Sequence, residues 1–524
     1  MKKILNYTLT GAVCLLMGAC SDLEEMNVNP NAASSVQSNM VMSGAEKWIM
    51  DNIYDNWFSA RQCLVYSQQW SQVNYTEEDR YRIRESVNNN YFNYLYQGLA
   101  SLQEVIRLNT EAAAANAVFG ANKNQIAAAK ILQVWTMDVI TDTWGSVPYS
   151  EAIKGSEGVL YAKYDDQKDV YKRMIETLTE AVAMIDESEP AFVAGDMIFD
   201  GDATKWKKFG NSLKCRLAIH LSKVDANWRQ YIQEAVASGV MESNDDAANF
   251  SYSSSGTDYC TFYNDFFVEK RNDFSINKVL VDLLKGQPDT LNAKTHPWTG
   301  VQDPRLMVYT TSNNGVYNGM CVATSTGVQA KLYTQDKCPN WYTNPPICLS
   351  KTYKVPLMTY AELKFILSEY NNYSVSDYKE GVRASLEYWY DIADMSISDA
   401  EIDEYVEAVS QNVNAEAVAV QKYIDLFTNG TEAWTEIRRT GYPEQIIRPG
   451  EVCAVLGDTE YKFTPMSEVK GDIVARVKYP TNESSLNGAN WKEAVSKLQD
   501  GTNNYYSKMF WDVRKSSYDH PANK

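Results

Sequence analysis

The sequence predicts a mostly α-helical protein, because its long segments place apolar residues on one face at steps of three and four. Residues 124–140 and 169–186 are the clearest examples, and each is long enough for several helical turns. Between them, Gly145 and Pro148 interrupt the pattern and indicate a loop. Helices paired through short loops indicate a helical-hairpin solenoid of the tetratricopeptide type.

Helical pattern is also found later in the chain. Further helices are predicted at residues 205–223, 357–370 and 423–439. Gly441 and Pro443 are typical helix stops, and after them the chain looks extended and loop-like to its end.

A long middle segment lacks the helical period and is rich in Ser, Thr, Asn, Gly, Pro and aromatic residues. We therefore expect one body at residues 39–524. It would hold a helical scaffold at about 39–240 and 357–443, and a large irregular insertion at about 241–356.

The N-terminus has the layout of a bacterial secretory signal. Lys2 and Lys3 precede an apolar run that ends in small residues, and this run is too short to span a bilayer. Gly18 and Ala19 directly before Cys20 resemble a lipobox, in which Cys20 is lipidated after residues 1–19 are removed. The alternative is a soluble periplasmic protein with an incidental cysteine.

Acidic residues follow the cysteine at once. Asp22, Glu24 and Glu25 resemble the signal by which Bacteroidetes send lipoproteins to the outer face of the outer membrane. Residues 20–38 would then form a flexible tether, since acidic and Asn-rich chain stays solvated. A solvated tether without any export signal is the alternative.

Composition excludes some functions and suits others. With 44% hydrophobic residues the chain can bury a large core. A formal charge of −18 argues against nucleic-acid binding and against attraction to an anionic membrane surface. The 35 Tyr and 13 Trp exceed what a core requires, and such rings suit surfaces that contact sugars or peptides.

The cysteines show no disulfide framework, because their spacing is irregular. Cys338 and Cys348 flank a proline-containing loop and could pair in an oxidising compartment, whereas Cys215 fits a helix core.

Catalytic motifs are missing from the sequence, which contains no zincin, nucleophile-elbow, phosphate-loop or dinucleotide signature. Asp265, Glu269 and Asp273 could supply an acid/base pair, but a solvated face is favoured. The three histidines are dispersed, and His220 fits a satisfied position on a helix. Arg438 and Arg439 fit an internal ion pair better than an anion site. The sequence therefore predicts no enzyme, no cofactor and no metal site.

Several strings together resemble the SusD/RagB family of Bacteroidetes outer-membrane nutrient-binding lipoproteins, in particular its SusD-like branch. Each string is weak alone, but in this order they extend along nearly the whole chain after Cys20. The strings are WGSVPYSEA (144–152), DGDATKWKKFGNSLKCRLAIHLS (200–222), RNDFSIN (271–277), DPRL (303–306), PLMTYAELKFILSEY (356–370), EGVRASLEYW (380–389), QKYIDLFTNGTEAWTEIRRTGYP (421–443) and RVKYPTNE (476–483).

The resemblance implies a scaffold of tetratricopeptide-like helix pairs carrying an irregular, ligand-presenting region. It implies a lipid-anchored protein on the cell exterior that closes over a SusC-like TonB-dependent transporter. It also implies capture of an oligosaccharide, or of a peptide in some relatives, without catalysis. An α-helical glycan-degrading enzyme and an adhesive surface protein are the alternatives.

Ligand contacts are expected from exposed rings next to amides, because sugars present an apolar C–H face and a rim of hydroxyls. Two segments outside the periodic helices offer such groups, and the resemblance places part of the site in the first. The candidates are Trp70, Asn74, Tyr75 and Tyr81 in the first segment, and Trp298, Trp341 and Tyr342 in the second.

Overall fold

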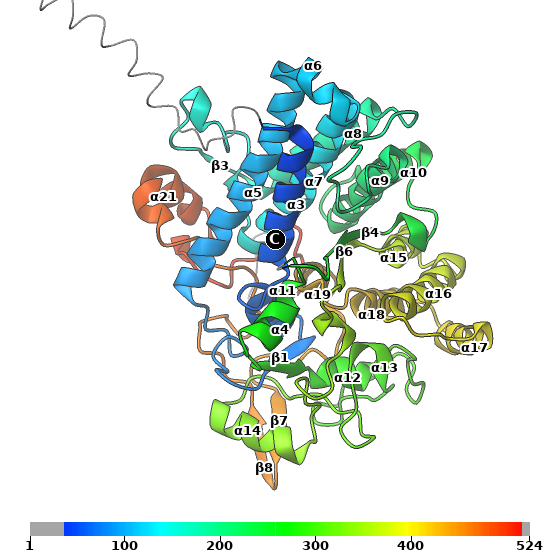
Figure 1. The fold of residues 1–524 in the computed structure, drawn as a ribbon. Helices are drawn as coiled ribbons and strands as arrows, with labels where there is room; N and C mark the ends of the chain where they lie inside the picture. The colour runs from blue at the N-terminus through cyan, green and yellow to red at the C-terminus, as the bar shows by residue number, and fades with distance from the viewer. Residues whose placement is uncertain (1–35, 257, 516–524) are drawn as a thin grey trace, which may run out of the picture.

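The computed structural model describes residues 36–256 and 258–515, which form a mostly helical body (Figure 1). The signal at residues 1–19, the lipidation site Cys20 and the acidic residues Asp22, Glu24 and Glu25 lie outside the described residues. The predicted fold class, a mostly α-helical scaffold of helix pairs, is confirmed.

The helices of the first half pack against one another in chain order. They are α3 (Ser38–Ile53), α5 (Glu85–Glu111), α7 (Asn122–Trp144), α8 (Gln167–Met184), α9 (Ala203–His220) and α10 (Trp228–Ser238). Each contacts the next: α3 packs on α5, α5 on α7, α7 on α8, α8 on α9, and α9 on α10. Neighbours in sequence are thus neighbours in space, as in a helical-hairpin solenoid.

Helix α9 shows how local sequence sets one of these elements. The Asp202 side chain accepts a hydrogen bond from the backbone N–H of Lys205 and caps the helix N-terminus. The predicted apolar face, which includes Trp206, Leu213 and Leu217, is completely buried. Burial of such a stripe, more than helix propensity, keeps the helix in place.

A second set of helices continues the scaffold. It comprises α15 (Tyr360–Tyr370), α16 (Val375–Ile392), α17 (Asp399–Val409), α18 (Ala415–Asp425) and α19 (Gly430–Thr440). Helix α15 packs on α16 and α18, α16 on α17, and α19 returns to contact α7. In Figure 1, α15, α16, α17 and α18 lie on the right below α9 and α10, and α19 lies near the centre.

Two helix predictions in this set need correction. The helix expected at 423–439 is broken between α18 and α19, because the Asn429 side chain accepts from the N–H of Glu432 and starts a new helix. The helix expected at 357–370 starts later, since strand β6 (Lys354–Met358) takes its first residues.

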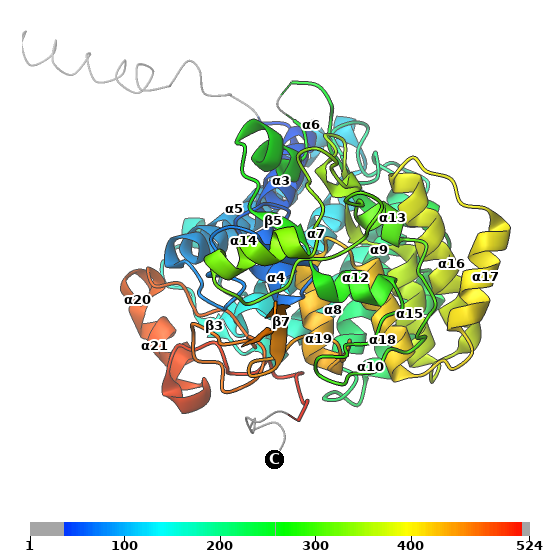
Figure 2. The same ribbon diagram turned by 90° about the horizontal axis from the view of Figure 1, so that it is seen from below.

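The middle segment holds short elements in place of long helices. They are η4 (Asn244–Asp246), β4 (Ala248–Ser251), α11 (Thr261–Tyr263), η5 (Asn264–Val268), β5 (Phe274–Ile276), α12 (Lys278–Leu284), α13 (Leu306–Tyr309), α14 (Thr326–Gln335) and η6 (Ile347–Leu349). Helices α12, α13 and α14 lie on the lower side of the molecule, which faces the viewer in Figure 2.

Paired strands tie this segment to the scaffold. Strand β4 pairs with β6, and β5 pairs with β1 (Trp70–Gln72), both antiparallel. The first half also contains η1 (Ser59–Cys63), α4 (Leu64–Tyr66), α6 (Ala113–Asn116), η2 (Ala117–Phe119), η3 (Gly155–Glu157), and the antiparallel pair β2 (Val147–Pro148) and β3 (Tyr164–Asp165).

The C-terminal part is more regular than the extended chain expected from the sequence. It contains the hairpin strands β7 (Val452–Leu456) and β8 (Thr459–Lys462), followed by α20 (Glu483–Leu486), α21 (Gly488–Ser496) and η7 (Gln499–Gly501). None of the described helices is long and apolar enough to span a lipid bilayer.

Candidate functional site

Four of the rings expected to contact ligand lie inside the protein. The exposed fraction is 0% for Trp70, 1% for Tyr81, 6% for Trp298 and 1% for Trp341, so their expected exposure is wrong. The ring of Trp70 is enclosed because β1 pairs with β5, and its centroid lies 5.1 Å from those of both Phe262 and Trp341. These side chains build the core under the surface segments.

The other three predicted residues are exposed. The exposed fraction is 55% for Tyr75 and 38% for Tyr342, and Asn74 is exposed as well. The Asn74 amide donates to the backbone carbonyl of Asn272 over 3.2 Å, and the backbone of Asn272 also hydrogen-bonds the Tyr342 hydroxyl. Asn74 and Tyr342 therefore come together at one place, although the sequence separates them widely.

A line of half-buried rings continues from Tyr342 and was missed from the sequence. We call Tyr259, Tyr263, Phe267 and Tyr342 the aromatic row. Successive centroids are 5.3, 5.1 and 6.1 Å apart. The first three residues are spaced by four; Tyr263 is the last residue of α11 and Phe267 lies in η5, while Tyr259 lies two residues before α11. That spacing was a usable signal inside a segment interpreted as irregular.

Trp57 is a further ring that sequence reasoning missed. It is partly exposed, and the guanidinium carbons of Arg61, Arg84 and Arg271 lie 5.0, 5.8 and 5.0 Å from its centroid. Cations near an indole face hold the ring in a fixed orientation. Trp57 is thus a rigid platform, which a flat ligand ring can meet without ordering a mobile side chain.

The arginines beside Trp57 are fixed by carboxylates. Arg61 lies 2.5 Å from Asp273 and Arg84 2.5 Å from Glu78, and Arg271 lies 3.2 Å from Asp273. Asp273, for which a solvated position was favoured over an acid/base role, is instead buried and engaged in ion pairs. Glu269 accepts from the amide of Asn264 over 3.3 Å.

The aromatic row and Trp57 are joined through Asp265. Its Oδ2 accepts from the backbone N–H of Asn56 over 3.1 Å, which ties η5 to the residue before Trp57. Asp55 accepts from the N–H of Phe58 over 2.7 Å. Burial raises the pKa of both Asp55 and Asp265 to about 7, and the Asp55 carboxylate adds to the effect on Asp265.

A hollow of about 390 Å³ opens at Trp57, within the size range of about 300–1,000 Å³ that small-molecule sites occupy. It combines apolar rings with amide and hydroxyl groups. We call it the Trp57 hollow; its lining is Asn52, Asp55, Trp57, Phe58, Ser86, Val87, Asn90, Tyr91 and Tyr94.

A larger hollow of about 720 Å³ lies elsewhere, between the segment before α9, strand β4 and helix α16. Its wall contains the carboxylates Asp200, Asp245, Glu387 and Asp391 among its polar groups. Volume alone does not make a site, so we place the candidate site at the Trp57 hollow and the aromatic row, where stacking faces and amides lie together.

The remaining residues singled out from the sequence are structural. Arg439 pairs with both oxygens of Glu369, at 2.8 and 2.6 Å, and with Glu436, which confirms an internal ion pair. Arg438 instead donates to the carbonyls of Asp142 and Ala475 and stacks on Trp434.

All seven cysteines within residues 36–256 and 258–515 are buried and unpaired. Cys338 and Cys348 are among them, so the pairing considered from the sequence is not formed. Cys215 is a core residue, as predicted.

Comparison with known proteins yields one family. The model of the SusD-like family described as "Starch-binding associating with outer membrane" matches residues 30–452. No curated protein matches the chain.

Solved structures show the same fold at low sequence identity. A SusD homolog from Parabacteroides distasonis is 21% identical with a TM-score of 0.72, and covers 91% of this chain and 97% of its own. A SusD homolog from Bacteroides uniformis is 22% identical with a TM-score of 0.70, covering 91% and 99%. A chitin-binding SusD homolog from Flavobacterium johnsoniae is 22% identical with a TM-score of 0.67, covering 91% and 100%.

Proposed function

Because this chain belongs to the SusD-like family of starch-binding, outer-membrane-associated proteins, we propose that it captures oligosaccharides at the cell surface and delivers them to a SusC-like TonB-dependent transporter. Members of this family are binding proteins, and the chain acts here as a binder without catalysis. Capture of a peptide in the same uptake role is the alternative.

The observation that carries the binding proposal is the combination of the Trp57 hollow with the aromatic row. Sugar rings stack their C–H faces on flat aromatic groups, while their hydroxyls bond to amides and carboxylates. Asn52, Asn90 and Ser86 line the hollow beside Trp57, and Asn74 lies close to Tyr342 through Asn272. An extended oligosaccharide would find aromatic rings to stack on and polar groups to hydrogen-bond along both the Trp57 hollow and the aromatic row.

Two glycan classes are the first to test. The family description names starch, and two of the similar structures are chitin-binding proteins. Maltooligosaccharides and chitooligosaccharides are therefore the appropriate probes, and peptides of similar length serve for the alternative.

The anchor and partner complete the proposal. Cleavage after residue 19 and lipid on Cys20 would hold the protein at the outer membrane, Asp22, Glu24 and Glu25 would direct it to the exterior, and residues 20–38 would act as the tether. The outer-membrane association of the family supports this location. Helix α3 begins at Ser38, so the tether would connect directly to the scaffold.

Calorimetry with the two probe classes tests the site. We expect Tyr342→Ala and Tyr263→Ala each to weaken binding of the recognised glycan about tenfold, or about 1.4 kcal/mol, because each removes a stacking face. Tyr161→Ala is the matched control: this ring is 66% exposed and belongs to neither the aromatic row nor the Trp57 hollow, so it should leave affinity unchanged.

Two outcomes would contradict the proposal. Wild-type affinity in both row variants would remove the aromatic row from the site. Release of new reducing ends from a purified glycan, abolished by neutralising one carboxylate, would replace the binding function with an enzymatic one.

A further inference from the structure

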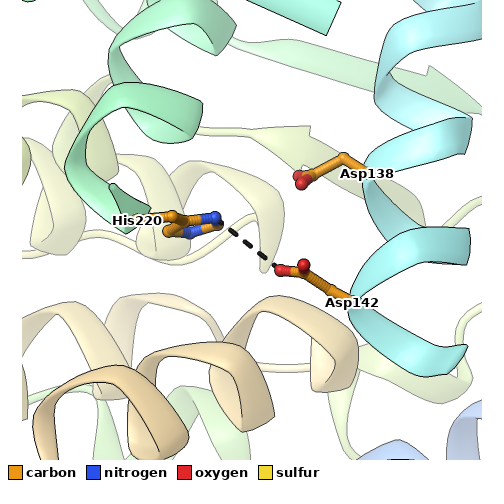
Figure 3. A group of neighbouring side chains, drawn as sticks. All are labelled: Asp138, Asp142 and His220. Carbon is orange, nitrogen blue, oxygen red and sulfur yellow. Dashed lines mark ion pairs between the residues drawn. The ribbon is translucent and has the colours of Figure 1, made fainter. Parts of the chain in front are cut away.

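His220 lies in a buried group of ionisable side chains within the scaffold. Asp138 and Asp142 of α7 face it from across the gap to α9, of which His220 is the last residue (Figure 3). The Tyr171 hydroxyl donates to Asp142 over 2.7 Å, so His220 donates on both sides, from Nδ1 to this hydroxyl over 3.0 Å and from Nε2 to Glu432 over 3.1 Å. This confirms the sequence interpretation of a satisfied residue, and its burial closes the group to a ligand from outside.

Trp57, in contrast, is surrounded by cationic side chains that reach the surface. We call Arg61, Arg84 and Arg271 the arginine cluster. The side chain of Arg84 is 39% exposed and that of Arg271 is 32% exposed, whereas Arg61 is buried. Three cations at one aromatic ring stand out in a chain whose formal charge is −18.

The carboxylates beside the arginine cluster do not balance its charge. Within the described residues, ion pairs connect the cluster only to Glu78 and Asp273, so three cations and two carboxylates leave one positive charge. Nε and Nη1 of Arg61 are also buried without a hydrogen bond. Unbalanced positive charge of this kind is costly until an anion approaches it.

Both exposed arginines have guanidinium nitrogens left for a ligand. Arg84 uses Nε for Glu78 over 2.5 Å, and Arg271 uses Nε and Nη2 for Asp273 over 3.3 and 3.2 Å. Nη1 and Nη2 of Arg84 and Nη1 of Arg271 donate to no group within residues 36–256 and 258–515. Such guanidinium edges match the oxygens of carboxylates and similar oxyanions.

The N-terminus of α5 adds further donors at the same place. Arg84 is the N-cap residue of this helix, and its side chain makes no capping bond. In the described part of the chain no group accepts from the backbone N–H of Glu85, Ser86 or Val87, and the last two residues line the Trp57 hollow. Free N–H groups and the helix dipole favour an anion here, while the Glu85 side chain is exposed and screened by solvent.

The lining of the Trp57 hollow itself accommodates an anion. Tyr91 belongs to the lining and is 3% exposed, and its hydroxyl is a donor with no partner among the described residues. Asp55 is the one acidic residue in the lining. Burial raises the pKa of Asp55 to about 7, so at about pH 6 most of this carboxyl is uncharged and repels an anion little.

We propose that the Trp57 hollow binds an anionic substituent, a carboxylate or a sulfate, on one sugar of the captured oligosaccharide. This rests on the proposed function, because the aromatic row would stack the neighbouring sugars. Arg84 and the N-terminus of α5 hold the substituent, and Arg271, which contacts the same indole, adds attraction. The substituent balances the excess charge of the arginine cluster, whereas a neutral glycan leaves its donors to water.

Calorimetry of the full-length protein at about pH 6, with probes of equal length, tests the proposal. Oligogalacturonides carry carboxylates alone, κ-carrageenan oligosaccharides carry sulfates alone, and maltooligosaccharides and chitooligosaccharides are neutral. We expect one anionic class to bind at least tenfold more tightly than either neutral class. This preference should decline as salt is raised from about 0.05 to about 0.5 M, because salt screens exposed charges.

Arginine variants then locate the anion. Arg84→Gln and Arg271→Gln should each lower the ratio of anionic to neutral affinity about tenfold. Arg107→Gln is the matched control, because Arg107 lies on the same helix, is 47% exposed and pairs with Glu104 and Glu111; it should keep the wild-type ratio. The salt dependence of the wild-type protein decides the matter if an arginine variant fails to fold.

The outcomes separate this proposal from the proposed function. The anion site is overturned if wild-type protein binds neutral probes at least as tightly as both anionic classes, or if both arginine variants keep the wild-type ratio, and glycan capture stands in either case. If wild-type protein binds none of the glycans, the proposed glycan capture is wrong and the anion site on a sugar fails with it. Binding of oligoglutamate would then assign the hollow to acidic peptides.

Discussion

Asp55 and Asp265, which lie at the candidate site, make the stability of the folded protein depend on pH. Their pKa values are raised to about 7 by burial, whereas an aspartate in the unfolded chain has a pKa of about 3.9. The folded protein therefore keeps protons that the unfolded chain releases. The stability from this source is fully present below pH of about 3.9 and is lost as the pH rises through 7.

This predicts the effect of Asp265→Asn. Asp265 is 7% exposed, so solvent screens it little, and between pH 5 and 6 it should contribute a slope of about 1.4 kcal/mol per pH unit to the free energy of unfolding. Urea unfolding from pH 5 to 8 should show a weaker loss of stability for Asp265→Asn than for wild type. Asp200→Asn, at an exposed aspartate, should follow the wild-type curve. Parallel curves for Asp265→Asn and wild type would mean that Asp265 titrates as in the unfolded chain.

Individual site residues were only partly accessible to sequence reasoning. Asn74, Tyr75 and Tyr342 are exposed, as a ligand contact requires, but exposure depends on strand pairing between segments that are far apart in the chain. Trp70 and Trp341 are of the residue type that also forms exposed stacking surfaces, yet the β1–β5 pairing buries them. Trp57 was missed because its arginine neighbours come together only in the folded protein.

Among the elements, the contact of α9 with α7 and α8 depends on Gly210. A Cβ there would lie 2.7 Å from Val182 Cγ1 and 2.9 Å from Ile131 Cδ1, both closer than real contacts allow. The helices approach this closely only because the residue has no side chain.

Gly210→Ala should therefore destabilise the protein by about 1–3 kcal/mol through overpacking. Gly44→Ala on α3 is the matched control, because no atom lies within 4 Å of a Cβ at that position. This change should stabilise the protein by up to about 1 kcal/mol, since Ala is the better helix former. Chemical unfolding measures both. Equal stability of the two variants would show that the helices shift apart at little cost.

Helices were predicted well where one apolar stripe extends over many turns. Residues 124–140 and 169–186 lie within α7 and almost entirely within α8, because each buries a face that its own sequence displays. The break between α18 and α19 depends on one capping bond of Asn429, and a period averaged over many residues does not detect it. The strands β4 and β6 are short and pair over a long sequence separation, so neither segment reveals its partner.

At the scale of the whole molecule, the candidate site lies where the helical scaffold meets the middle segment. Helices α3 and α5 of the scaffold supply most of the lining of the Trp57 hollow, and the aromatic row continues on α11 and η5 of the middle segment. The scaffold therefore supplies part of the proposed binding surface itself.

Membrane attachment is the remaining whole-molecule prediction. We propose attachment through lipid at Cys20, because a doubly or triply acylated cysteine is expected to hold a protein firmly at a bilayer. Cys20→Ala should abolish lipid labelling and shift the protein from the membrane fraction to the soluble fraction. Cys14→Ala is the matched control, because Cys14 would be removed with the signal, and this variant should remain lipidated.

Replacing Asp22, Glu24 and Glu25 together with Ala should preserve the lipid but protect the protein from protease added to intact cells. If Cys20→Ala stays in the membrane fraction, the lipid is not the anchor. If the triple variant is digested as fast as wild type, the acidic residues only solvate the tether.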